Sequence, residues 1–328
     1  MMDTESQTQI ANTADDPPGS VSVVVPSHNH ARFIEAALSS IINQTLAPAE
    51  LLVIDDGSRD DSAAIIERTL KDCPFACELI VRENRGLSAT LNEGFARVSG
   101  DYFAYLGSDD LWLPGFLEAR VGLLERRPKA ALAYGHAYYV DEQNRIIDST
   151  ADWAHYADGD ARDMLLQTIG PMSPTVLYRR AALERERWDE TSKLEDYDLY
   201  LRLSEHGEFA FDPQILSAWR RHDSNVSWDQ RLMLDEQLKA QREGALRFGF
   251  SNEQLQKLQR ATRFNRAEDF LRTGQKSQAL SLMLHNFGGI SSAPATARML
   301  LRLLIPNSIM KSRAQRRQRT AHQKYGSL

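Results

Sequence analysis

The sequence predicts an α/β protein whose mostly parallel sheet is flanked by helices. The first observation is a set of apolar runs of strand length, each followed by a polar turn, at residues 21–25, 51–54, 78–81 and 102–106. The second is that segments with apolar residues at helical spacing separate these runs, which is the alternation typical of a parallel sheet. The third is that 42% of the 328 residues are apolar, enough for a sizeable core.

Each expected strand is followed by a segment with one apolar helical face. These faces comprise Ile34, Ala37, Leu38, Ile41 and Ile42; Ile65, Ile66 and Leu70; and Leu87, Leu91, Phe95 and Val98. Ligands of open α/β sheets bind at the carboxyl ends of the strands. No Gly-x-Gly-x-x-Gly follows the first strand and no Walker-type motif occurs, so a dinucleotide dehydrogenase and a P-loop NTPase are poorly supported.

The charge is unevenly distributed along the chain. The formal net charge of -6 argues against binding of nucleic acid by the whole surface. Residues 1–19 are polar and acidic without periodicity, so we expect a disordered N-terminal tail. The N-terminus resembles no secretory signal, and no window reaches the roughly 20 apolar residues of a spanning helix. These features predict a cytoplasmic protein.

The only two cysteines are Cys73 and Cys77. Their spacing fits neither a redox pair nor half of a usual zinc site. We therefore expect both to be reduced, as in a cytosolic protein.

Two of the expected strands end in adjacent carboxylates. Asp55 and Asp56 follow the second strand, and Asp109 and Asp110 follow the fourth. Two ionised carboxylates repel each other, and oxygen ligands suit Mg²⁺ or Mn²⁺, so a divalent cation at this edge would keep both charged. In the alternative, Asp109 or Asp110 caps the next helix, and Asp60 caps the helix after the second strand.

Four motifs occur in order along the first third of the chain. They are V-V-V-P-S-H-N at 23–29, I-D-D-G-S at 54–58, N-R-G-L-S-A-T-L-N at 84–92 and L-G-S-D-D at 106–110. Their order and spacing resemble the family 2 glycosyltransferases, and the similarity extends over residues 20–228. The resemblance implies a GT-A fold, with a Rossmann-like sheet, and inverting transfer from a nucleotide-diphospho-sugar.

The resemblance also implies roles for residues at the strand ends. The residues expected to bind the nucleotide are Pro26, His28, Asn29, Asp55, Asp56, Asp109 and Arg220. Asp110 is expected to bind a divalent metal directly, with Mn²⁺ or Mg²⁺ as the cofactor. Residues 217–227 resemble the closing segment of the family, in which Arg220 contacts the diphosphate and His222 completes the metal shell. The alternative for His222 is a purely structural histidine.

A third acidic pair, Glu195 and Asp196, begins an expected helix. A helix N-terminus stabilises an ionised carboxylate, as a general base requires, although the same position suits an ordinary N-cap. The resemblance implies that Asp196 takes the proton from the acceptor hydroxyl and that Glu195 supports it. The processive Gln-x-x-Arg-Trp signature is absent, which favours transfer of a single sugar.

The chain divides at about residue 228. Before it, Trp153, His155 and Tyr156 either line an acceptor groove or pack as ordinary surface aromatics. After it, apolar spacing predicts an appended helical subdomain over 229–310, including a helical hairpin that turns at Thr273-Gly274. Residues 311–328 form a basic tail with six bases and no acid, which either contacts an anionic membrane face or is simply solvated.

The sequence thus predicts a hexosyltransferase-like enzyme with a nucleotide-sugar donor, UDP-sugar favoured. The acceptor is a saccharide or lipid-linked saccharide in surface polysaccharide or glycolipid assembly, at the cytoplasmic side of the membrane. The alternatives are a nucleotidyltransferase and a non-catalytic scaffold that binds nucleotide sugars. The former lacks the glycine-rich basic loop used for triphosphates, and the latter would not need every expected carboxylate.

Overall fold

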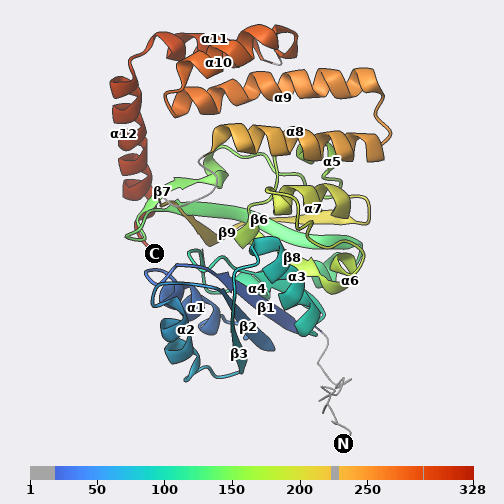
Figure 1. The fold of residues 1–328 in the computed structure, drawn as a ribbon, viewed down its shortest axis with the longest axis vertical. Helices are drawn as coiled ribbons and strands as arrows, with labels where there is room; N and C mark the ends of the chain where they lie inside the picture. Colours follow the sequence, from blue (N-terminus) through green and yellow to red (C-terminus); the bar gives the residue numbers. More distant parts are fainter. Residues whose placement is uncertain (1–18, 223–228, 291) are drawn as a thin grey trace, which may run out of the picture.

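The computed structural model describes residues 19–222, 229–290 and 292–328 (Figure 1). Apart from Gly19, the predicted N-terminal tail lies outside the described residues. The α/β part occupies one end of the molecule and a stack of helices the other.

The strands form one mixed sheet in the order β3-β2-β1-β4-β8-β6-β9-β5, with β7 paired to β6. The strands are β1 Val21–Ser27, β2 Glu50–Asp56, β3 Ala76–Arg82, β4 Tyr102–Tyr105, β5 Leu111–Trp112, β6 Ala130–Val140, β7 Ile146–Ser149, β8 Leu177–Arg179 and β9 Glu208–Arg220. The first four are parallel neighbours, as the alternation of strands and helices predicts. β8 and β5 are antiparallel to their neighbours, so the second half of the sheet is mixed.

Helices cover both faces of the sheet and then stack away from it. The helices of the α/β part are α1 Ile34–Ile42, α2 Ser62–Leu70, α3 Leu87–Arg97, α4 Phe116–Arg126, α5 Arg162–Leu166, α6 Arg180–Leu183 and α7 Glu195–Leu203. The stacked helices are α8 Gln230–Arg247, α9 Asn252–Arg272, α10 Lys276–His285, α11 Ala293–Leu304 and α12 Asn307–Tyr325. Figure 1 shows α8, α9 and then α10 with α11 in successive layers above the sheet.

The alternation of side chains along β1 shows why its run of valines is buried on both faces. Val23 and Val25 pack with Leu38 of α1, whereas Val24 packs on the opposite face with Phe95 of α3. Successive residues of a strand point to opposite faces, so the sequence of a strand that is covered on both faces is a continuous apolar run.

β6 and β7 pair antiparallel and form a hairpin whose turn lies at residues 141–145. β6 also pairs in parallel with the long strand β9. The end of β9 lies close to the loop that follows β4, as the hydrogen bond from the backbone N–H of Arg220 to Asp110 shows. The sheet therefore joins segments that lie 110 residues apart in the chain.

The predicted helical hairpin is confirmed by α9 and α10. Ser251 caps α9 through a reciprocal capping box with Gln254. Gly274 has a φ of +82° in the turn before α10, a conformation that favours glycine. Among the described residues, no helix combines the length and apolarity needed to cross a membrane.

The predicted basic tail is a helix in the structure. α12 runs from the far end of the helical stack down the side of the molecule to β7 (Figure 1). Its end is held by Lys324, whose amine donates to Asp152 over 2.8 Å, and by the ring of Tyr325 packed on Tyr138. The sequence gives no local signal for these contacts, because the residues that fix the end of α12 are distant in the chain.

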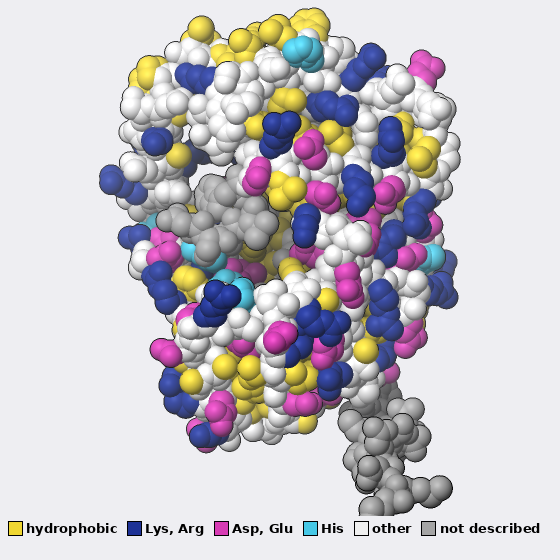
Figure 2. Space-filling view, in the orientation of Figure 1, with side chains coloured by type: hydrophobic (Ala, Val, Ile, Leu, Met, Phe, Trp, Pro, Cys, Tyr) yellow, Lys and Arg dark blue, Asp and Glu magenta, His cyan; other side chains and the backbone are white. Residues whose placement is uncertain are grey.

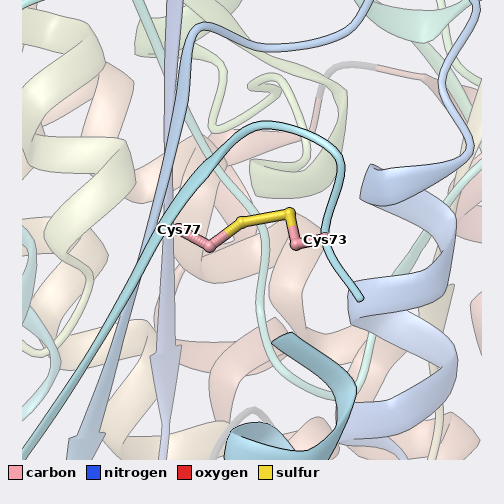
Figure 3. Close-up of a disulfide and its surroundings, with 2 residues drawn as sticks. All are labelled: Cys73 and Cys77. Carbon is pink, nitrogen blue, oxygen red and sulfur yellow. A yellow bond between two sulfur atoms is a disulfide. The ribbon is translucent and has the colours of Figure 1, made fainter. Parts of the chain in front are cut away.

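Cys73 and Cys77 form a disulfide in the turn between α2 and β3 (Figure 3). The prediction of reduced cysteines is therefore wrong. The turn places the two Cα atoms 6.8 Å apart, at the upper end of the range for disulfides. A spacing that fits neither a redox pair nor a zinc site still allows a short-range disulfide, so the cysteines give no support to a reducing compartment.

Gly94 of α3 provides a test of how closely α3 packs on β1. An added Cβ would lie 2.6 Å from a methyl carbon of Val24, so Gly94→Ala is expected to destabilise the fold by about 1–3 kcal/mol despite its better helix propensity. In Gly122→Ala of α4 the Cβ meets only the flexible end of Arg126 at 3.4 Å, so this control gains up to about 1 kcal/mol. Urea denaturation measures both variants, and equal stabilities would contradict the described packing.

Candidate active site

A cavity of about 730 Å³ opens at the carboxyl ends of β1, β2 and β4. Figure 2 shows the hollow in the middle of the face that it displays. The start of α7 and residues of α8 form the opposite wall. Of the predicted site residues, Pro26, His28, Asp56, Asp109, Asp110, Glu195 and Asp196 line the cavity. Asn29, Asp55, Arg220 and His222 are not among its lining residues and take other positions.

Asp56 is held at the end of β2 by three donors. Its carboxylate accepts the backbone N–H of Arg85 over 2.9 Å and of Gly86 over 2.8 Å, and it pairs with the guanidinium of Arg82. Arg82 lies directly opposite Asp56 in the parallel register of β2 and β3. Sequence reasoning missed Arg82, although its place at the end of the third strand was a usable signal. These bonds fix the loop after β3 as one wall of the cavity.

His28 lies in the loop after β1 and lines the cavity. Its Nδ1 is 2.9 Å from the backbone oxygen of Asp56, so the ring is oriented by the next strand. Asn29 has a φ of +56° and joins the same two loops, because its N–H donates to Ser58 and its side-chain oxygen accepts from Arg59. The structure therefore gives Asn29 a role in shaping the loops.

Asp55 lies beneath this wall. It is 1% exposed, and its Oδ1 accepts the N–H of Ser58 over 2.8 Å, which closes the turn after β2. Asp60 accepts the N–H groups of Ser62 and Ala31. Both acids thus fix the backbone around the cavity.

The turn of Asp109 and Asp110 is fastened to the end of β9. Asp110 is 3% exposed and accepts the N–H of Arg220 over 2.8 Å, while the Nε of Arg220 donates to the carbonyl of Asp109 over 2.7 Å. Burial and the neighbouring charge of Asp109 raise the pKa of Asp110. The cap of α4 is Gly115, without a side-chain hydrogen bond, so neither aspartate is a helix cap. Arg220 is itself 1% exposed and lies beneath the turn.

His30, Asp109 and His222 form a cluster suited to a metal ion. One ligating atom from each lies within 4.8 Å of the others. The Nε2 of His222 is 2.8 Å from Asp109, and the Nδ1 of His30 is 3.8 Å from the other carboxylate oxygen. The carboxylate is a ligand type that suits Mn²⁺, and imidazoles are common ligands of divalent transition metals. Sequence reasoning singled out His222 and missed His30, which lies two residues beyond His28.

The pKa of Asp109 favours this role. Burial alone would raise the pKa, but the hydrogen bond from His222 and the charge of His30 hold it below the usual value. Asp109 is therefore ionised, as a metal ligand must be.

Asp196 lies across the cavity at the start of α7. Its carboxylate accepts the hydroxyl of Tyr105, at the end of β4, and the indole N–H of Trp188 over 3.5 Å. The N-cap of α7 is Leu194 with no side-chain cap, so the alternative of an N-cap is excluded. Tyr105 and Trp188 were both missed in the sequence, since nothing in their spacing indicates contact with Asp196.

Glu195 and Asp196 are neighbours in the chain, and both are partly buried. Burial raises the pKa of Asp196, although the hydrogen bonds from Tyr105 and Trp188 lower it in part. Burial and then the charge of Asp196 raise the pKa of Glu195. Such a pair holds a proton at pH values where an isolated carboxyl would have lost it.

The aromatic residues predicted near an acceptor groove separate into two groups. Trp153 is exposed, and its ring lies 6.4 Å from that of Tyr139, which meets Trp219 edge to face at 5.5 Å. Trp219 lines the cavity, so these rings form a row that leads out of it. Tyr156 instead packs within the aromatic core beside Tyr134.

Comparison with known proteins gives matches to glycosyltransferases. The sequence model of Glycosyl transferase family 2 matches residues 22–187, which is half of the chain. An uncharacterized glycosyltransferase of Nostoc sp. is 28% identical over 169 residues, covering 50% of this chain and 52% of that relative. The chain therefore spans about half the length of this relative.

Two solved structures resemble the fold over 93% of the chain. The mannosyltransferase PcManGT from Pyrobaculum calidifontis, in complex with GDP-Man and Mn²⁺, has a TM-score of 0.58 at 18% identity and is covered over 86% of its length. S. aureus TarS 1-349 in complex with UDP-GlcNAc has a TM-score of 0.60 at 15% identity and is covered over 91%.

The fold is thus that of the GT-A glycosyltransferases, with a helical region after the sheet. Since the family model extends from β1 to the segment before α7, the chain belongs to glycosyl transferase family 2. The fold expected from the four sequence motifs is confirmed.

His222→Ala tests the metal cluster. Loss of one of the three ligands is expected to weaken Mn²⁺ binding by more than about tenfold. Even loss of a residue that only hydrogen-bonds to a metal ligand lowers metal affinity about 10- to 100-fold. His155→Ala, an exposed histidine outside the cluster, is the matched control and keeps the affinity. Isothermal titration with Mn²⁺ measures both. Equal affinities in the two variants would exclude His222 as a ligand.

Proposed function

We propose that this protein is an inverting glycosyltransferase that moves a single sugar from a nucleotide-diphospho-sugar to an acceptor hydroxyl. The observation that supports it most is that His30 and Asp109 of the candidate metal cluster line the same cavity as Glu195 and Asp196. A donor bound across the cavity would meet a metal on one side and a base on the other. The solved neighbours were crystallised with nucleotide sugars, one of them with Mn²⁺.

We assign the donor diphosphate to the metal cluster. His30, Asp109 and His222 would hold the ion, with Asp110 behind Asp109. When bound, Mn²⁺ or Mg²⁺ neutralises the charge that develops on the departing nucleoside diphosphate. Arg220 holds the Asp109 and Asp110 turn from below through its hydrogen bonds and keeps the ligands in register.

The nucleobase is assigned to the wall formed by Pro26, His28 and Asp56. The ring of His28 offers a stacking face, and Asp56 retains acceptor capacity for a base N–H besides its three bound donors. UDP is the favoured nucleotide by analogy with the UDP-GlcNAc complex, and GDP is the competitor from the GDP-Man complex.

Asp196 is the proposed general base. Its carboxylate takes the proton of the acceptor hydroxyl while that oxygen bonds to the anomeric carbon from the face opposite the diphosphate. The bond from the anomeric carbon to the diphosphate oxygen breaks, and its electron pair leaves with the nucleoside diphosphate. Tyr105 orients Asp196, and Glu195 supports it as a neighbouring acid. General-base catalysis of this kind contributes about 10²- to 10⁴-fold.

The acceptor is proposed to be a saccharide or a lipid-linked saccharide, bound along the row of Trp219, Tyr139 and Trp153. Aromatic faces suit the apolar faces of sugar rings, and this row leads out of the cavity. We further propose that the protein acts in the cytoplasm at the inner face of a membrane, in the assembly of surface polysaccharide or glycolipid. The acid-free C-terminal segment supports this location.

A thermal-shift screen tests the donor site. Purified protein is expected to be stabilised by one of UDP, GDP, dTDP, CMP and ADP, with Mn²⁺ present and not with EDTA, because a ligand of the native state raises its stability by mass action. Stabilisation by none of the five would contradict the donor site. Release of pyrophosphate from a sugar phosphate and a nucleoside triphosphate would instead indicate a nucleotidyltransferase.

Asp196→Asn tests the base. The variant is expected to lose about 10²- to 10⁴-fold in kcat, because an amide accepts no proton, while the nucleotide-induced thermal shift is unchanged. The retained thermal shift is the internal control for folding. Unchanged turnover would remove Asp196 from the mechanism.

The acid side of the pH–rate profile tests the Tyr105 contact. The base works only when ionised, so kcat/KM falls as the pH drops through its raised pKa. Tyr105→Phe removes a hydrogen bond that lowers the pKa of Asp196, and we expect this acid limb to move to higher pH. Tyr138→Phe, at a tyrosine that packs on Tyr325 away from the cavity, should leave the limb in place. If the acid limb stays in place in both variants, the assignment of Asp196 as the base in contact with Tyr105 is contradicted.

A further inference from the structure

The far end of the helical stack exposes a group of large apolar side chains. Figure 2 shows hydrophobic side chains along this end of the molecule. We define the apolar tip as the exposed residues Leu284, Phe287, Leu300, Leu301, Leu304 and Ile309, which come from α10, the turn after it, α11 and the start of α12. Leu304 is 81% exposed and Phe287 68%. Single exposed apolar residues are ordinary, but a group of this kind marks an interaction surface.

The apolar tip is a second apolar face of helices that already have a core face. α10 contacts α9 through Ala279 and Met283, and α11 adds Met299 to the same cluster. The leucines of the tip point away from this cluster and are exposed. Folding of the chain therefore does not account for their apolar character.

The charge around the tip is strongly positive. Residues 270–328 contain ten lysines and arginines and no aspartate or glutamate, in a chain whose net charge is -6. Arg272 and Arg302 pair with Glu268, and Lys324 pairs with Asp152. Five further bases of α12 are exposed and have no ion pair with any described residue; they are Lys311, Arg313, Arg316, Arg317 and Arg319.

We propose that the apolar tip docks into the surface of an anionic phospholipid bilayer. The apolar side chains would enter the boundary between headgroups and acyl chains. Arg298 of α11 and Lys311 and Arg313 at the start of α12 lie next to the tip residues in the chain and would contact anionic headgroups, and the rest of α12 extends the positive field. This surface shares only the first bases of the tail expected from the sequence and adds the apolar residues of α10 and α11, while the far part of α12 is fixed to β7.

The other occupants fit these features less well. In a symmetric dimer through the tip, the same patch would face itself, so the bases around it would repel each other. A nucleic acid would use the bases but leave the exposed leucines in water. Only an anionic membrane uses both the apolar side chains and the acid-free surroundings.

Vesicle co-sedimentation of the full chain tests the proposal. We expect binding to phosphatidylcholine vesicles that contain about 30% phosphatidylglycerol and no binding to phosphatidylcholine alone. Raising the salt from about 0.1 M to about 0.5 M NaCl should weaken the binding, because salt screens the headgroup attraction. Failure to bind the anionic vesicles at low salt would overturn the proposal.

Two pairs of substitutions separate the apolar and the electrostatic parts. Leu301→Ser with Leu304→Ser is expected to reduce partitioning at least about tenfold, and Lys311→Ala with Arg313→Ala about fivefold per base. Leu246→Ser, at a leucine of α8 that is 51% exposed, and Lys71→Ala are the matched controls and should bind like the wild type. Equal losses in controls and test variants would contradict a specific surface.

Two further outcomes would favour another partner. Dimerisation that Leu301→Ser with Leu304→Ser abolishes would assign the tip to a second copy. Binding of single-stranded RNA that exceeds vesicle binding and survives the leucine substitutions would assign the bases to nucleic acid. Docking to a membrane would serve the proposed transfer to a lipid-linked acceptor, and in this respect it rests on the proposed function. Vesicle binding is measured without nucleotide sugar, so membrane docking and sugar transfer can fail separately.

Discussion

The buried guanidinium of Arg220 is the contact on which the candidate active site depends. From the end of β9 it bonds the carbonyls of Asp109 and Asp141, and its own N–H bonds Asp110. Three segments, the loop after β4, the turn after β6 and the end of β9, are therefore held by one residue. His222 follows two positions later, and its Nε2 lies 2.8 Å from Asp109. Arg220 is thus a positioning residue for the metal cluster.

The cavity contains acids whose pKa values are shifted in opposite directions. Asp109 is next to two imidazoles and stays ionised, which suits a metal ligand. Glu195 and Asp196 are next to each other in a partly buried place, which favours retention of a proton and suits acid–base work. The difference comes from partners and not from the residue type. An arrangement of this kind lets one cavity bind a charged diphosphate and also move a proton.

The sequence predicts the strands and the acids at their ends because both follow from local patterns. Apolar runs and their spacing indicate the elements, and the Asp55-Asp56 and Asp109-Asp110 pairs come directly after two of them. His30, Arg82 and Tyr105 escaped prediction because their roles depend on pairing between distant segments. The register of β2 with β3 sets Arg82 against Asp56, and α7 brings Asp196 to Tyr105. Asn29 and Asp55 show the reverse case, since motif residues expected at the nucleotide instead shape the loops.

The course of α12 has a mechanical consequence. Its far end is joined to the β6–β7 hairpin, where the N–H of Leu328 donates to Asn144 and the N–H of Ile146 donates to Gly326. The same turn supplies the carbonyl of Asp141 to Arg220. α12 is therefore a brace between the apolar tip and the turn beside the metal cluster. A tilt of the helical stack relative to the sheet must either break these bonds or shift that turn. The orientation of the helical stack on a surface is therefore linked to the geometry of the candidate metal ligands.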